Sequence, residues 1–288
     1  MRLHELEQYR FIDIHYHADP DLYRRSLDVW GAGKQYQALQ GAVFLKSHLG
    51  ATSIQAQIAQ HHGLPVFPSV ALNAIAGGID YRVICRALAE YKAHPHTRML
   101  VDFPTITGRK YTSKLPRQLL HPALEKFTLA AETVFDERQQ LRKEVIDILK
   151  MARDYPIVLT TGHACKEEIY ALIEACSQYN VPALLLNQPA NPLTGLPAEE
   201  LRALAKHEFV WIEQTFLTYV LGHQSEADFL TVLASLPRVI YSSDLGQPKQ
   251  MGVAHWINHS RKLFTEFGIS VSRQDEIMRR NPISLLAI

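Results

Sequence analysis

Cysteine is scarce in this sequence, and long hydrophobic runs are absent. The 288 residues include three cysteines, Cys85, Cys165 and Cys176, and none of them belongs to a CxxC pair. This spacing argues against a disulfide framework and against a zinc-thiolate site, so we expect buried or unreactive thiols in a reducing compartment. The N-terminus is polar and no later run is long enough to span a bilayer, so the expected location is the cytoplasm.

The sequence also has little net charge. Its 30 lysines and arginines nearly balance 29 aspartates and glutamates, while 47% of the residues are hydrophobic. This composition supports a sizeable core and gives no overall electrostatic attraction to nucleic acid or to a membrane. We therefore expect a small-molecule substrate as the partner. Symmetric homo-oligomers are common among soluble proteins, so self-association is kept as an alternative to a monomer.

Short apolar runs rich in β-branched residues alternate with longer stretches of helical period. This alternation is typical of a parallel sheet covered by helices. The strand candidates are Phe11–His15, Ala42–Lys46, Val66–Leu72, Met99–Phe103, Ile157–Thr160, Ala183–Leu186, Phe209–Ile212 and Val239–Ser242. Eight such βα units of roughly 30 residues predict an α/β fold, a single-domain (β/α)8 or TIM barrel over residues 1–288.

One βα unit is much longer than the others. A polar stretch from Pro104 to roughly Asp136 follows the fourth strand. Long loops in compact domains are usually lids or binding loops, and in a barrel this one would lie over the catalytic mouth. Its charged and aromatic side chains, Arg109, Lys110, Tyr111 and Lys114, predict recognition of an acidic group on the substrate, with solvated loop charges as the alternative.

The first strand reads FIDIHYH. Because side chains alternate along a strand, we expect Asp13, His15 and His17 to face the barrel interior and the residues between them to face the helices. Neutral imidazole is a favoured ligand of zinc and other transition metals. His15 and His17, at the end of the first strand, are therefore predicted metal ligands.

The second strand places Lys46 and His48 on one face. A lysine that ends a buried strand has two interpretations. The first is a snorkelling amine or an ion pair with a carboxylate at the mouth. The second is a desolvated amine that reacts with carbon dioxide and ligates metal as a carbamate. His48 is a candidate substrate contact or metal ligand.

Three further candidates follow the fifth, seventh and eighth strands. His163 ends IVLTTGH, where the alternative is a core histidine bonded to a backbone carbonyl, and Asp244 ends VIYSSD, where the alternative is a helix cap. Glu213 ends VWIE and is either a catalytic carboxylate or a partner of a mouth cation. The carboxyl ends of barrel strands meet at one face, which is where barrel enzymes build their active sites.

With these residues in place, the sequence resembles the amidohydrolase superfamily of metal-dependent hydrolases. Its pattern of HxH, a fifth-strand histidine and a final aspartate is matched by His15, His17, His163 and Asp244, and the closing NPISLLAI is similar to the segment that often ends such chains. The resemblance is greatest to an uncharacterised branch that carries LKSH, VALN with a GG pair, and SSDLG. It implies a divalent metal, with zinc expected, as one or two ions.

The sequence departs from that pattern at two positions. Asn187 stands where the superfamily has a sixth-strand histidine, and an amide is a poor transition-metal ligand, so we expect Asn187 to contact substrate. Lys46 lies on the second strand, whereas the carboxylated lysine of the superfamily is more usual on the fourth. Lys46 is therefore a metal ligand as a carbamate or a substrate contact, with His48 or Glu213 completing the metal shell.

The predicted reaction is hydrolysis of an amide, lactone or ester bond by a water that the metal activates. Asp244 would act as the base, and Lys46 or Asn187 would stabilise the developing oxyanion. Two alternatives remain open: a metal-dependent lyase or decarboxylase on the same barrel, and a catalytically inactive, metal-stabilised binding protein, which the asparagine at position 187 motivates.

Overall fold

The computed structural model describes residues 4–92, 96–110 and 114–288. The strands are β1 (Phe11–His17), β2 (Gly41–Lys46), β3 (Val66–Phe67), β4 (Ser69–Ala71), β5 (Met99–Asp102), β6 (Ile157–Thr160), β7 (Leu184–Leu186), β8 (Val210–Thr215) and β9 (Val239–Ser242). The α-helices are α1 (Val29–Ala38), α2 (Ser53–His61), α3 (Tyr81–Ala89), α4 (Lys143–Asp154), α5 (Lys166–Tyr179), α6 (Ala198–Leu204), α7 (Phe216–Val220), α8 (Glu226–Ser235), α9 (Val253–Glu266), α10 (Val271–Asp275) and α11 (Asn281–Leu286). Short helical turns are η1 (Glu5–Gln8), η2 (Ala74–Ala76), η3 (Pro122–Lys126) and η4 (Glu276–Arg280).

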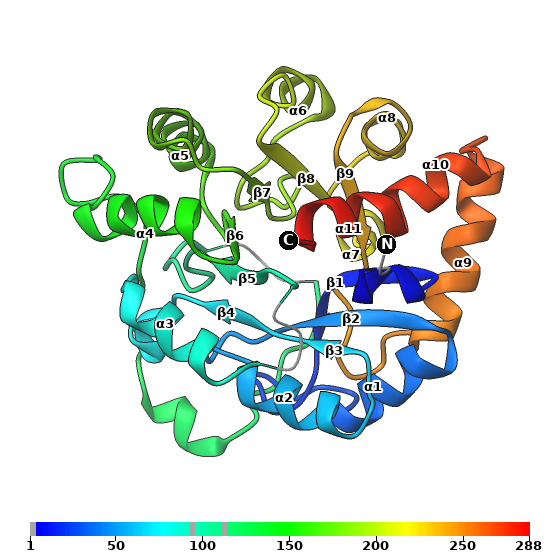
Figure 1. Cartoon of the computed structure of the whole chain (residues 1–288), viewed down its shortest axis with the longest axis horizontal. Helices are drawn as coiled ribbons and strands as arrows, with labels where there is room; N and C mark the ends of the chain where they lie inside the picture. The colour runs from blue at the N-terminus through cyan, green and yellow to red at the C-terminus, as the bar shows by residue number, and fades with distance from the viewer. Residues whose placement is uncertain (1–3, 93–95, 111–113) are drawn as a thin grey trace.

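The strands form the predicted (β/α)8 barrel. All strand pairs are parallel, in the orders β1-β2-β3 and β4-β5-β6-β7-β8-β9. β2 also lies against β4, and β1 against β9, where a parallel bridge joins Tyr16 to Leu245 and closes the ring. Figure 1 shows the strands at the centre, helices around them, and α11 lying across the strands.

The third predicted strand, Val66–Leu72, is divided into β3 and β4. Pro68 separates the two parts because proline has no backbone N–H to donate to a neighbouring strand. β3 pairs with β2 and β4 pairs with β5, so together they occupy the place of one barrel strand. The division leaves the barrel order unchanged.

The helices form where one face of the periodic pattern is apolar. In α5, Ile169, Leu172 and Cys176 are buried on one face against the outer core. The helix begins after Cys165, whose backbone N–H donates to the Glu168 carboxylate at 2.8 Å, as in a capping box. All three cysteines of the chain are free thiols.

The barrel interior contains its own apolar cluster. Its members come from most of the strands and from the two ends of the chain: Leu6, Ile12, Ile14, Ala42, Phe44, Phe67, Leu100, Val158, Leu185, Ile240, Leu285 and Leu286. A second, larger cluster lies between the strands and the helices. Since the interior is filled with side chains, the polar residues at the strand ends meet only at the mouth of the barrel.

The side-chain alternation along β1 differs from the predicted one. Ile12 and Ile14 face the interior cluster, whereas Asp13 accepts a hydrogen bond from the Tyr36 hydroxyl of α1. The prediction that Asp13 faces the interior is therefore wrong. The β1–β2 register shifts between Asp13 and Tyr16, and such an irregularity resets the alternation. Past the shift, the two histidines of the strand face the barrel mouth.

The long loop after the fourth strand, β5, is present as predicted and is tied to the loop after β1. Residues 22–24 and 118–120 run antiparallel, with a bridge between Tyr23 and Leu119. Two backbone hydrogen bonds of 2.9 and 3.0 Å accompany it. Among the described residues, no helix has the length and apolarity that a membrane crossing requires.

Candidate metal centre

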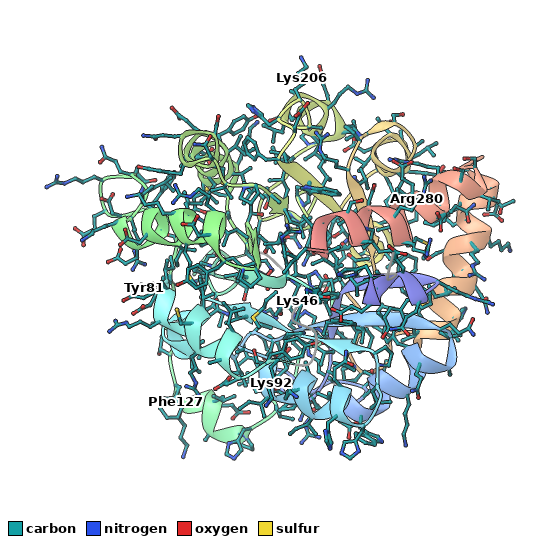
Figure 2. The ribbon with its side chains drawn as sticks, in the orientation of Figure 1. Lys46, Tyr81, Lys92, Phe127, Lys206 and Arg280 are labelled. Carbon is teal, nitrogen blue, oxygen red and sulfur yellow. The ribbon has the colours of Figure 1, made fainter. Side chains whose placement is uncertain are left out.

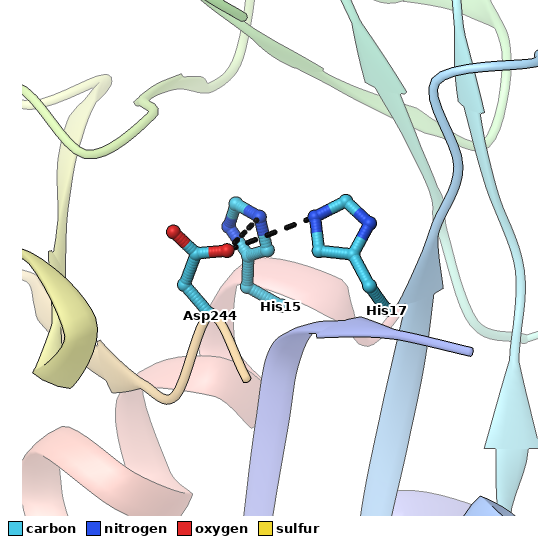
Figure 3. A group of neighbouring side chains, drawn as sticks. All are labelled: His15, His17 and Asp244. Atoms are coloured by element: carbon cyan, nitrogen blue, oxygen red, sulfur yellow. Dashed lines mark ion pairs between the residues drawn. The ribbon is translucent and has the colours of Figure 1, made fainter. Parts of the chain in front are cut away.

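Three predicted ligands meet at the mouth of the barrel. The Asp244 Oδ1 atom lies 3.3 Å from His15 Nε2 and 3.7 Å from His17 Nε2, as Figure 3 shows. Both imidazoles are almost completely buried. Ligands at about 2.0–2.2 Å from a tetrahedral zinc lie about 3.3–3.6 Å from one another, so the spacing of these three atoms suits such an ion.

The opposite ring nitrogen of each histidine contacts a buried carboxylate. His15 Nδ1 lies 3.1 Å from Glu213 Oε1, and His17 Nδ1 lies 3.0 Å from Asp21 Oδ2. A histidine that ligates metal usually donates its second N–H to such a group, which fixes the tautomer and orients the ring. Both Nε2 atoms are then unprotonated and direct their lone pairs toward the Asp244 oxygen.

The electrostatics of the site are consistent with a cation between these atoms. Burial favours neutral His15, but the carboxylates of Glu213 and Asp244 outweigh burial and raise its pKa to about 8. A proton on His15 relieves the repulsion between its lone pair and Asp244 when no other cation is bound. Burial and the Arg25 charge hold the pKa of His17 well below its usual value. Two imidazoles and one carboxylate match the protein donor set of many catalytic zinc sites.

The backbone around Asp244 is held in an unusual conformation. Asp244 has a φ of +52°, and its N–H donates to the His15 carbonyl at 2.9 Å. Gly246 has a φ of +117°, and a Cβ there would come within 1.9 Å of the His17 carbonyl oxygen. The glycine therefore allows the segment after β9 to lie directly against the end of β1.

Lys46 lines the same pocket and pairs with a residue that sequence reasoning missed. Its Nζ atom lies 2.5 Å from Asp102 Oδ1 at the end of β5, and both side chains are buried. Figure 2 shows Lys46 near the centre of the molecule, whereas Tyr81, Phe127 and Lys206 lie at its periphery. This contact is the ion pair of the first interpretation. Asp102 could have been found in the sequence, because it is a charged residue at the end of an apolar strand, as Lys46 is.

His163 and Asn187 also line the pocket, although neither belongs to the three-atom group. Burial and the Arg117 charge lower the pKa of His163 to about 4, so the ring is neutral. Asn187 Nδ2 donates to the Gly162 carbonyl, and its buried Oδ1 has no partner within the described part of the chain. Asn187 thus offers the pocket an unpaired acceptor.

A second group consists of His17, Asp21 and His48. The oxygens of Asp21 already accept hydrogen bonds from the Arg25 guanidinium, the Ser47 hydroxyl and the backbone N–H of His48. One of them also contacts the His17 ring. Asp21 therefore supports His17 instead of presenting an open oxygen to a metal. Burial, together with nearby positive charges that include Arg25, lowers the pKa of His48 to about 3.

The loop arginine that was predicted to recognise an acidic group, Arg109, does not line the pocket. Arg109 donates to the His163 carbonyl and pairs with Glu168 at 2.8 Å, behind the pocket lining. Tyr111 lies outside the described residues. Besides Lys46, the pocket is lined by Arg25 and Arg117. Neither follows a strand, so the strand-end rule could not identify them.

Comparisons with known proteins support the fold. A solved structure titled as an uncharacterised TIM-barrel protein, Bb4693 from Bordetella bronchiseptica, superimposes with a TM-score of 0.51 over 88% of this chain and 80% of its own, at 11% identity. No curated protein matches the sequence. The model of a family of unknown function, DUF6282, matches residues 10–213, which include the first-strand histidines, Lys46 and His163. The chain therefore belongs to the DUF6282 family, whose function is unknown.

Proposed function

We propose that this barrel is a metal-dependent hydrolase that cleaves an amide, lactone or ester bond of a small molecule. One observation carries the proposal. Two buried imidazoles, each held from behind by a carboxylate, direct their free nitrogens at one oxygen of Asp244. Nothing in the folding of a barrel requires three electron-rich atoms to converge in this way, and a divalent cation, with zinc expected, makes the arrangement favourable.

The surrounding residues have separable roles in this proposal. A divalent metal lowers the pKa of water and so supplies a nucleophile near neutral pH. Burial raises the pKa of Asp244, which suits its carboxylate to accept a proton and return it to the leaving group. Glu213 orients His15 from behind and does not line the pocket, so we assign it positioning instead of catalysis.

Lys46 is the proposed donor to the developing oxyanion. Its ammonium lines the pocket and uses one contact on Asp102, which leaves further N–H groups for substrate. Asn187 Oδ1 is buried without a partner among the described residues, so we assign this residue to accept a hydrogen bond from the substrate, while its Nδ2 donates to the Gly162 carbonyl.

The first test is elemental analysis of the purified protein. We expect about one equivalent of a divalent metal per chain, and its loss in His15→Ala. The matched control is His61→Ala, which removes an exposed imidazole at the end of α2. A wild-type protein that stays metal-free after incubation with zinc, or equal metal content in both variants, would contradict the proposed site.

The second test is activity of the zinc-loaded protein on a panel of amides, lactones and esters. Chelation should abolish turnover, and Asp244→Asn should lower it by about 10²-fold or more because the proton acceptor and one candidate metal ligand are lost together. The control Asp154→Asn changes an exposed carboxylate on α4. Reaction in oxygen-18 water separates hydrolysis, which labels the product, from the lyase alternative. Inactivity on the whole panel by a metal-loaded protein would favour the binding-protein alternative.

A further inference from the structure

We propose that the ligand of this pocket carries a carboxylate and that Arg25 and Arg117 bind it, beside the ring of Tyr23. The inference deepens the proposed function, since calling the ligand a substrate rests on that function. Binding of the carboxylate by the two guanidinium groups does not depend on it. The two ideas can therefore fail separately.

Arg25 is buried at the pocket, and part of its guanidinium has no hydrogen-bond partner among the described residues. Its side chain is 1% exposed and lines the pocket. Its Nε and Nη2 atoms both donate to Asp21 Oδ2, at 2.9 and 2.5 Å, whereas the buried Nη1 has no acceptor among the described residues. A buried N–H of a charged group without an acceptor is destabilising, so this atom points to a ligand oxygen.

The second observation is that the long loop brings another guanidinium to the same place. Residues 118–120 pair with residues 22–24, which sets Arg117 over the first loop. The guanidinium carbons of Arg25 and Arg117 lie 6.0 and 5.2 Å from the centre of the Tyr23 ring. Both guanidinium groups also line the same pocket, so an anion bound there would be attracted by both positive charges.

The proposed anion site uses other residues than the metal centre. The His48 ring stacks on His17 at 5.1 Å between centroids and meets the Tyr23 ring edge-on at 5.9 Å. The anion is assigned to the two guanidinium groups and not to the candidate metal ligands, so its binding does not require the metal. Leucines from the long loop and from α7, Leu115 and Leu217, line the same pocket and suit an apolar part of the ligand.

The apolar residues beside the two guanidinium groups favour a carboxylate over a phosphate. Arg25 donates from Nε and Nη2 to Asp21, and its buried Nη1 amino group is left to donate to the ligand. A carboxylate carries less charge than a phosphate, so its transfer from water into a pocket partly lined by leucines costs less.

The experiment uses hexanoate and its neutral counterpart hexanamide as probes. Binding of each is measured by isothermal titration calorimetry, with the metal-free protein and with the zinc-loaded protein. We expect hexanoate to bind both forms at millimolar concentration and hexanamide to bind at least about tenfold more weakly, because hydrogen bonds to a charged group are the stronger ones. Turnover is not measured, so this result is independent of the proposed hydrolase.

The decisive variant is Arg117→Met, since Arg117 is exposed on a loop and its loss should leave the fold intact. We expect about tenfold weaker hexanoate binding, and a similar loss in Arg25→Met. The control is Arg153→Met, in which an exposed arginine of α4 paired with Asp154 is lost. The proposal is overturned if hexanoate does not bind, if hexanamide binds equally well, if Arg117→Met matches the control, or if inorganic phosphate binds more tightly than hexanoate.

Discussion

The carboxylate behind His15 offers the sharpest test of the metal centre. Glu213 is almost completely buried and accepts hydrogen bonds from Ser242 Oγ at 2.7 Å and from the Gln188 N–H at 3.2 Å, in addition to its contact with His15. Glu213→Gln keeps the size of the side chain and removes its charge. The exchange therefore tests the electrostatic support of His15 with little change in packing.

The expected loss of zinc affinity follows from the weaker hydrogen bond between His15 and an uncharged residue 213. A hydrogen bond to a charged group contributes about 1.5–3 kcal/mol and a neutral one about 0.5–1.5 kcal/mol, so the exchange costs about 1–1.5 kcal/mol. This cost corresponds to roughly a tenfold loss of affinity, at the lower end of the about 10–100-fold seen when such supporting groups are changed. Zinc affinity is measured by competition with a chromophoric chelator.

Glu168→Gln is the matched control. Glu168 is equally buried, but its partners are Arg109 and the N-terminus of α5, so its loss should lower stability without changing zinc affinity. Equal zinc affinities of the wild type and Glu213→Gln would refute the supporting role. Equal losses in the two variants would instead attribute the effect to general destabilisation.

Two further predictions concern stability in urea. Lys46→Met leaves the buried Asp102 carboxylate without its cation and should lower the free energy of unfolding by about 3–5 kcal/mol. Adding Asp102→Asn should restore much of this stability. No recovery in the double variant would contradict a charge effect. Gly246→Ala should cost more than Gly268→Ala, since both glycines have positive φ with a strain of about 1–3 kcal/mol, but the new Cβ meets the His17 carbonyl only at Gly246; equal costs would show that this close approach is not maintained.

Much of the barrel could be predicted because its strands are short apolar runs rich in β-branched residues. The errors have local physical causes. Pro68 divides one strand because it cannot donate a hydrogen bond, and the register shift after Asp13 reverses the alternation of β1. A single extra residue in a register leaves no mark in an alternating sequence, so Ile12 and Ile14 could not be assigned to the interior from their spacing.

The candidate site divides in the same way. His15, His17 and Asp244 could be predicted because strand ends converge in any barrel. Asp21 and Arg25 lie on the loop after β1, and Arg117 lies on the long loop, so their positions depend on loop conformations that periodicity does not encode. Arg109 was predicted to bind substrate from its place on the long loop. Its guanidinium instead pairs with Glu168 of the neighbouring helix α5, a contact that the sequence pattern does not reveal.

The backbone pairing between residues 22–24 and 118–120 joins the two halves of the pocket mechanically. The stretch next to Asp21, which steadies a ligand histidine, is the same stretch to which the long loop is fastened. Any outward swing of the long loop that admits a ligand must either break this short ladder or drag the histidine's support with it. Opening of the pocket to a ligand would then change the orientation of His17 at the metal centre.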